Sequence, residues 1–219
     1  MLMAEEAGRA PAEAEAYYCA AGWTPDQIGR WRDQYGGFAK GVSDLPKAFE
    51  RLSQGDEIDL GDVWTVVVGS GHSPEHVCLW RRSDNVVIAG DQILPRISSN
   101  VSVWPTEPMA DPLGDWLSSI SDLKSRLPDD CLILPAHGDP FYGVKPRLDA
   151  LARGHDLALK RLERTLRQPS RVVDGFSAVF GRSIGDAVLG MATGEAQAHL
   201  NYLERRGRAV RERDENGVD

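Results

Sequence analysis

Three short segments of this chain each place a side chain that can bind a metal ion directly after an apolar, strand-like run. They are Gly71–His76 with His72, Ile88–Asp91 with Asp91, and Leu134–Gly138 with His137. The preceding runs are rich in β-branched residues, which predicts strands. Imidazole and carboxylate groups are common zinc ligands. Three strand ends that present His, Asp and His therefore predict one metal site assembled from separate parts of the chain.

A simpler interpretation exists for each of these residues taken alone. His72, Asp91 or His137 could be an ordinary turn residue whose side chain bonds to nearby backbone. For any one of them we favour that interpretation. For all three, in this order and each after a strand-like run, we favour a metal site.

In this order, the three segments resemble the second half of the metallo-β-lactamase superfamily of hydrolases. In that family an earlier motif, His-x-His-x-Asp-His, supplies most ligands of two zinc ions. The resemblance implies that His72 completes one zinc site and that His137 completes the other. It implies that Asp91 bridges both metals and acts in catalysis beside the zinc-bound hydroxide. The resemblance extends from about Leu60 to the C-terminus.

The chain departs from the family pattern because His-x-His-x-Asp-His is absent. Its five histidines are His72, His76, His137, His155 and His199. No two of them are separated by a single residue, so residues 1–59 cannot carry the motif. That segment instead predicts helices at Met3–Ala21, Thr24–Tyr35 and Leu45–Leu52. We interpret it as a helical insert, in a hydrolase that lacks the N-terminal half of the family domain through start-site choice, truncation or divergence.

The rest of the chain predicts an α/β fold in two parts. Residues 60–169 form the second half of an αββα sandwich, and residues 170–219 form a winged-helix-like module. The first part is predicted to contain strands at Glu57–Gly69, Val77–Trp80, Val86–Ala89 and Cys131–Leu134, helices at Pro112–Leu127 and Lys145–Leu166, and a loop over the site at Gln92–Pro108. The module is predicted to contain helices at Asp174–Phe180, Gly185–Ala192 and Gly194–Arg206, then a strand at Arg208–Arg213.

Charge and composition narrow the classes of partner. The net charge of −8 disfavours nucleic acid and anionic membranes as partners. From Ser170 to the C-terminus, seven Arg, no Lys and eight acidic residues favour a packing or homodimerisation module over a DNA reader. No apolar run approaches the roughly 20 residues of a membrane span, and no signal peptide is visible. Three widely spaced cysteines favour a reducing cytoplasm, with Cys78 and Cys131 buried.

Three residues near the motifs are candidates for supporting roles. His76 is predicted to orient the turn that holds His72, and a buried histidine satisfied by backbone is an equal alternative. Arg96 and Asn100 lie in the loop after Asp91 and are predicted to contact substrate, with a solvated loop arginine as the alternative for Arg96. His155 and His199 are predicted to be surface or packing residues.

The function that the resemblance implies is zinc-dependent hydrolysis of a small-molecule ester, thioester or lactone. With the family's first motif absent, weak activity is expected. One alternative is a catalytically inactive remnant that serves as a binding or dimerisation module. The other is a nucleic-acid-binding protein or nuclease. Zinc content distinguishes a zinc hydrolase from the first alternative, and salt-dependent RNA binding distinguishes it from the second.

Overall fold

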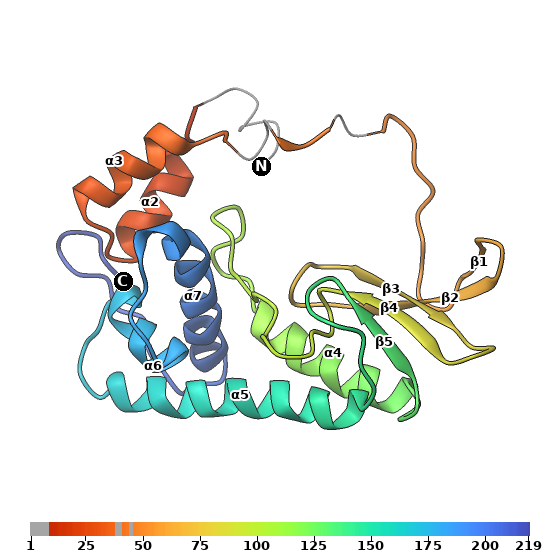
Figure 1. Cartoon of the computed structure of the whole chain (residues 1–219). Coiled ribbons are helices and arrows are strands. Elements are labelled where there is room, and N and C mark those ends of the chain that lie inside the picture. The colour runs from red at the N-terminus through yellow and green to blue at the C-terminus, as the bar shows by residue number, and fades with distance from the viewer. Residues whose placement is uncertain (1–8, 38–40, 44–45) are drawn as a thin grey trace. The chain divides into compact units, whose positions relative to one another are not determined.

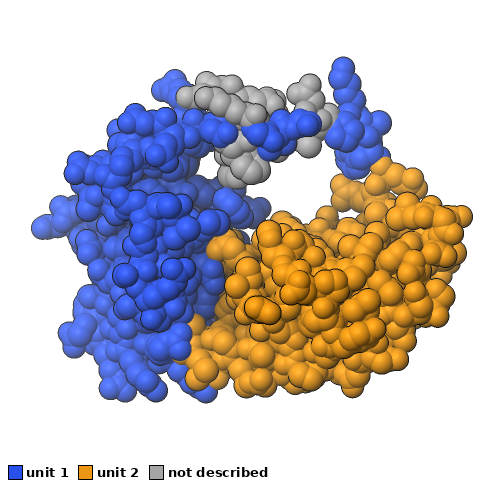
Figure 2. Space-filling model, viewed as in Figure 1, with its two compact units in different colours: residues 1–49, 103–110, 159–219 blue, residues 50–102, 111–158 orange. Residues whose placement is uncertain are grey.

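The computed structural model describes residues 9–37, 41–43 and 46–219. The chain divides into two compact units, which Figure 2 colours separately. The sheet unit comprises residues 50–102 and 111–158, and the helical unit comprises residues 1–49, 103–110 and 159–219. Each unit therefore combines stretches that are far apart in the sequence.

The sheet unit is built on five strands in the order β1-β2-β3-β4-β5 (Figure 1). They are β1 (Glu57–Asp59), β2 (Val63–Gly69), β3 (His76–Arg81), β4 (Val86–Gly90) and β5 (Leu132–Pro135). Strands β1 to β4 pair antiparallel, and β5 runs parallel to β4. A parallel pair needs a crossover connection, which contains helix α4 (Pro112–Arg126). The strands lie where the sequence predicts them, except that Glu57–Gly69 forms two strands.

The two faces of this sheet differ in exposure. Trp80 lies opposite Val87, which lies beside Ile133, and all three are buried. On the other face, Val77 and Ile88 are each 40% exposed. The alternation follows from the two-residue period of a strand. The sheet unit thus has one apolar face in its core and another that keeps apolar side chains in contact with solvent.

Cys78 and Cys131 are both buried, which confirms the prediction from their apolar runs. Burial raises the pKa of Cys78 to about 12 and that of Cys131 to about 11. Both thiols are therefore protonated near neutral pH, and they behave as small apolar core residues rather than nucleophiles.

The helical unit contains the first and last helices of the described chain. Its elements are α2 (Ala12–Ala20), α3 (Pro25–Gln34), the end of α5 (Val144–Thr165), η2 (Val172–Gly175), α6 (Phe176–Phe180), η3 (Asp186–Val188) and α7 (Leu189–Arg205). Thr24 and Gln27 form a capping box, so α3 begins where the sequence predicts. Trp23 Nε1 donates to Thr193 Oγ1 at 2.9 Å, which ties the N-terminal helices to α7. None of the described helices is long and apolar enough to span a bilayer.

The N-terminal segment has fewer helical residues than the sequence predicts. Residues 3–8 of the first predicted helix lie outside the described residues, and so does Leu45. The predicted helix at Leu45–Leu52 is wrong, because residues 46–52 contain no helix. Phe49 is 79% exposed there. A short helix without a buried apolar face lacks the packing that stabilises most helices in proteins.

The winged-helix prediction is also not supported. The predicted helix Gly185–Ala192 is instead the short η3 followed by the start of α7. The predicted strand Arg208–Arg213 does not form. Side chains hold this segment instead: Arg211 donates to Asn201 Oδ1 at 2.7 Å and to Glu204 Oε2 at 2.8 Å. The extended conformation therefore depends on charged hydrogen bonds rather than on a neighbouring strand.

His199, predicted to be a surface or packing residue, is only 1% exposed in α7 and donates from Nδ1 to the Glu195 carbonyl at 2.8 Å. Burial lowers its pKa to about 4. The unfolded chain binds this proton at the ordinary pKa of 6.5, so the stability that this residue contributes is complete above pH 6.5 and falls as pH drops toward 4.

Because of the lowered pKa of His199, we expect the free energy of unfolding to fall by about 2–3 kcal/mol between pH 7 and pH 4.5. Urea unfolding of the wild type and of His199→Gln at both pH values measures it. The variant should lose less stability than the wild type on acidification, by about that amount. Equal losses in the two proteins would contradict the prediction. The comparison of variants removes the contributions of other titrating groups.

Candidate functional site

His72 is held in a tight turn after β2. The turn depends on Gly71, whose φ is +98° and whose amide donates to the Ser73 carbonyl. The ring nitrogen Nδ1 of His72 lies 2.8 Å from the Asn100 carbonyl oxygen. A carbonyl can only accept, so Nδ1 carries the hydrogen. In a neutral ring the other nitrogen, Nε2, then has a free lone pair.

Asp91 follows Gly90 at the end of β4. Gly90 has a φ of +53°, and the pairing of β4 with β5 is irregular between Ile88 and Gly90. The backbone carbonyl of Asp91 accepts a hydrogen bond from Ser99 Oγ. The side chain of Asp91 is 32% exposed. The strand end therefore presents a fixed carboxylate that solvent can reach.

His137 follows β5 in the neighbouring position. The Ala136 amide donates to the Gly90 carbonyl at 2.9 Å, so the ends of the two parallel strands meet. His137 is 66% exposed, and its Nε2 lies 3.4 Å from Asp91 Oδ1. His72 Nε2 lies 3.7 Å from the other carboxylate oxygen, Oδ2. The structure thus brings all three predicted residues together, with one imidazole beside each oxygen of Asp91.

This arrangement leaves a place for positive charge. With Nδ1 of His72 protonated, its Nε2 lone pair and the Asp91 carboxylate would face each other as two acceptors. A second ring proton or a cation between them removes that conflict. Two ligands of one tetrahedral zinc are separated by about 3.4 Å, close to both measured distances. The donor types and the pair separations fit zinc.

The set of donors is nevertheless incomplete. Among the described residues, no group of three or more His, Cys, Asp or Glu side chains converges in a way that could hold a metal ion. Each oxygen of Asp91 has a single imidazole partner, which gives two incomplete ligand pairs around one carboxylate. These residues alone therefore supply fewer ligands per metal than the three that a catalytic zinc usually has.

His76 lies beside the site and packs over Gly90. A Cβ at Gly90 would lie 2.7 Å from Cε1 of His76, so the imidazole sits directly on the backbone that leads to Asp91. The rings of His72 and His76 are 5.9 Å apart. Burial and then the nearby His72 lower the pKa of His76. A supporting role is consistent with these contacts.

The two predicted substrate-binding residues differ in their surroundings. Arg96 is exposed. Asn100 is partly buried, its carbonyl accepts from His72, and its side-chain oxygen accepts from Ser102 Oγ at 2.6 Å. Asn100 therefore orients a candidate ligand with its backbone, a contact that sequence reasoning missed because backbone groups leave no residue-type signal.

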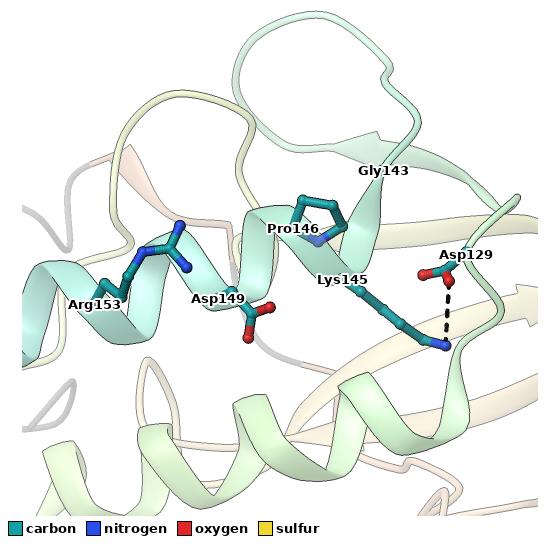
Figure 3. Close-up of a pocket in the computed structure, with 6 residues that line it drawn as sticks. All are labelled: Asp129, Gly143, Lys145, Pro146, Asp149 and Arg153. Carbon is teal, nitrogen blue, oxygen red and sulfur yellow. Dashed lines mark ion pairs between the residues drawn. The ribbon is translucent and has the colours of Figure 1, made fainter.

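A separate hollow of about 460 Å³ lies near the start of α5 (Figure 3). Its lining residues are Asp129, Gly143, Lys145, Pro146, Asp149 and Arg153. Lys145 pairs with Asp129 at 3.6 Å, as the dashed line shows. Asp149 pairs with Lys124 on α4. None of the predicted site residues lines this hollow, and Asp129, Lys145 and Asp149 are engaged in ion pairs, so it is not our candidate site.

Comparison with known families decides the identity of the fold. Residues 5–137 match the family model "Metallo-beta-lactamase superfamily". The chain belongs to this superfamily. Residues 159–219 match "Metallo-beta-lactamase-like, C-terminal domain", which covers the region that the sequence predicts to be winged-helix-like. The family predicted from His72, Asp91 and His137 is thus confirmed.

Solved structures of this superfamily resemble the chain over most of its length. A beta-lactamase domain protein from Burkholderia ambifaria is 36% identical with a TM-score of 0.86, covering 94% of this chain and 60% of that one. A metallo-beta-lactamase family protein from Thermus thermophilus shares the fold, with 24% identity, a TM-score of 0.70 and coverage of 90% and 60%. The α/β fold class is therefore confirmed.

The matches to curated relatives cover only part of each protein. An uncharacterized protein from Aquifex aeolicus is 31% identical over 108 residues, which is 48% of this chain and 49% of that protein. A probable metallo-hydrolase from Bacillus subtilis is 22% identical over 156 residues, which is 70% of this chain and 48% of that protein. The chain spans about half the length of these relatives.

Proposed function

We propose that the protein acts in zinc-dependent hydrolysis of a small-molecule ester, thioester or lactone. The observation that carries the proposal is the Asp91 carboxylate with His137 Nε2 at 3.4 Å from one oxygen and His72 Nε2 at 3.7 Å from the other. A shared carboxylate between two imidazoles is suited to two neighbouring zinc ions. The Bacillus subtilis relative, described as a probable metallo-hydrolase, supports the reaction class.

Each site residue has a distinct task in this proposal. Asp91 would be shared by both metals and would hold them next to each other. His72 and His137 would each donate Nε2 to one metal, and the Asn100 carbonyl would keep His72 in the required tautomer. When bound, zinc lowers the pKa of a coordinated water to about 7 and polarises the scissile carbonyl. Arg96, exposed on the adjacent loop, would attract an anionic part of the substrate.

Metal titration of an Asp91 variant tests this proposal. We expect Asp91→Asn to weaken zinc binding at least about tenfold, because even partners outside the ligand shell are worth 10–100-fold. Isothermal titration of the metal-free chain with zinc measures the affinity. Asp122→Asn, an exposed carboxylate on α4, is the control for the same change of charge. Equal zinc affinity in the wild type and Asp91→Asn would refute a metal role for Asp91.

An inactive chain that serves as a binding or dimerisation module is the second candidate. One observation favours it: the described residues hold no converging group of three metal ligands. The exposed Val77 and Ile88 give such a module an apolar surface for a second copy. Absence of zinc binding together with a stable dimer in sedimentation would favour this candidate. The net charge of −1 from Ser170 onward disfavours the third candidate, a nucleic-acid-binding protein or nuclease.

A further inference from the structure

One loop contacts two of the candidate ligands and the residue next to the third. We call residues 92–102, which follow Asp91 directly, the site loop. Its Asn100 carbonyl accepts from His72 at 2.8 Å, and its Ser99 hydroxyl donates to the Asp91 carbonyl. Pro95 packs against the residue after His137: a Cβ on Gly138 would lie 2.8 Å from Cγ of Pro95. The position of this loop therefore affects every member of the site.

The site loop has no strand or helix of its own, so its shape depends on contacts from elsewhere. Arg147, in the first turn of α5, donates from Nε to the Leu94 carbonyl at 2.5 Å and from Nη2 to the Ile97 carbonyl at 2.7 Å. Further along α5, His155 Nε2 lies 3.4 Å from Ser98 Oγ. The guanidinium thus ties together two carbonyls that are three residues apart in the loop.

The chemistry of Arg147 suits this task. A guanidinium presents several donors in a fixed plane, so one side chain bonds to two carbonyls at once. Hydrogen bonds from a charged donor are stronger than neutral ones. Arg147 is half-buried, and this burial lowers its pKa. A lysine would carry the same charge, but all of its N–H donors lie on one nitrogen.

We propose that Arg147 is a positioning residue for the candidate metal site. By fixing the site loop at Leu94 and Ile97, it keeps the Asn100 carbonyl on Nδ1 of His72, so that Nδ1 carries a ring hydrogen and Nε2 is the nitrogen that faces Asp91. The effect on His72 is a property of the metal-free chain. Any effect on hydrolysis rests on the function proposed above.

The tautomer of His72 tests this inference directly. In ¹⁵N-labelled, metal-free full chain at pH 8, long-range ¹H–¹⁵N spectra report which ring nitrogen carries the hydrogen, and His72→Gln assigns the signals. We expect the Nδ1–H form to predominate in the wild type. In Arg147→Met the ratio of Nδ1–H to Nε2–H should fall by roughly tenfold, as expected for the loss of one hydrogen bond. An unchanged ratio in a folded Arg147→Met chain would overturn the proposal.

Two further variants separate positioning from general damage. Arg153→Met removes an arginine from the same helix at the hollow of Figure 3, and should leave the ratio at its wild-type value. Arg147→Lys keeps the charge but has a single donor nitrogen, and should shift the ratio part of the way. If Arg147→Met does not fold, Arg147→Lys decides: a wild-type ratio there overturns the inference. Because neither metal nor substrate is present, a failure of the proposed hydrolase function leaves this result unaffected.

Discussion

The 219-residue chain should bind zinc only weakly and hydrolyse esters slowly. Adding a segment that carries His-x-His-x-Asp-His should raise the zinc affinity and the rate of hydrolysis at least about a hundredfold. Catalytic zinc usually has three protein ligands and a water. Here each zinc would have one imidazole, from His72 or His137, and a share of Asp91. Two ligands per metal are too few for tight binding, and each missing ligand matters more than the 10–100-fold effect of an outer partner.

Fusion of such a segment to this chain, or its co-expression, provides the comparison. Metal analysis and an ester or thioester assay measure zinc per chain and turnover. A matched segment with both histidines of His-x-His replaced by glutamine should bind to the chain equally well but restore neither property. Nearly two zinc ions per chain without any added segment, with turnover abolished by His72→Ala, would show that the site is completed in another way.

The positions of the strands and of the candidate site could be predicted because their signals are local. Each apolar run ends at a glycine, a polar turn or a motif residue, and β2, β3, β4 and β5 coincide with these runs. Parallel or adjacent strand ends then meet at one edge of the sheet, which brings His72, Asp91 and His137 together. The start of α3 could also be predicted from the sequence, because a capping box is a short sequence pattern.

The contacts that shape the site could not be predicted from the sequence. His72 is 28 residues from Asn100, and Arg147 is 50 or more from the carbonyls that it binds. The acceptors are backbone groups, which every residue has. Local patterns also misled where tertiary contacts decide: Arg208–Arg213 leads into a turn as a strand would, yet Arg211 binds α7 through its side chain. The helix predicted at Leu45–Leu52 does not form over residues 46–52, where Phe49 is 79% exposed and so adds no buried apolar face.

Gly71→Ala is expected to destabilise the chain by about 3 kcal/mol and to displace His72. The φ of Gly71 is +98°, which costs an L-residue about 1–2 kcal/mol. A Cβ there would also lie 2.5 Å from Cβ, 2.6 Å from Cα and 2.7 Å from the backbone nitrogen of Trp116. Trp116 is fully buried in α4, so these atoms cannot move aside without disturbing the core. Overpacking of this kind typically costs roughly a further 1–3 kcal/mol.

Gly61→Ala separates the two parts of this effect. Gly61 has a similar φ of +93° and open space where its Cβ would be, so that variant should show only the conformational cost of about 1–2 kcal/mol. Urea unfolding followed by circular dichroism compares the two variants. The difference between them measures the close approach of the His72 turn to α4. Equal destabilisation would mean that the turn can move away from Trp116 at no cost, and the His72 tautomer measured in Gly71→Ala should then remain that of the wild type. A larger loss in Gly71→Ala, together with a changed tautomer, would show that packing of this turn on α4 is what places His72 beside Asp91.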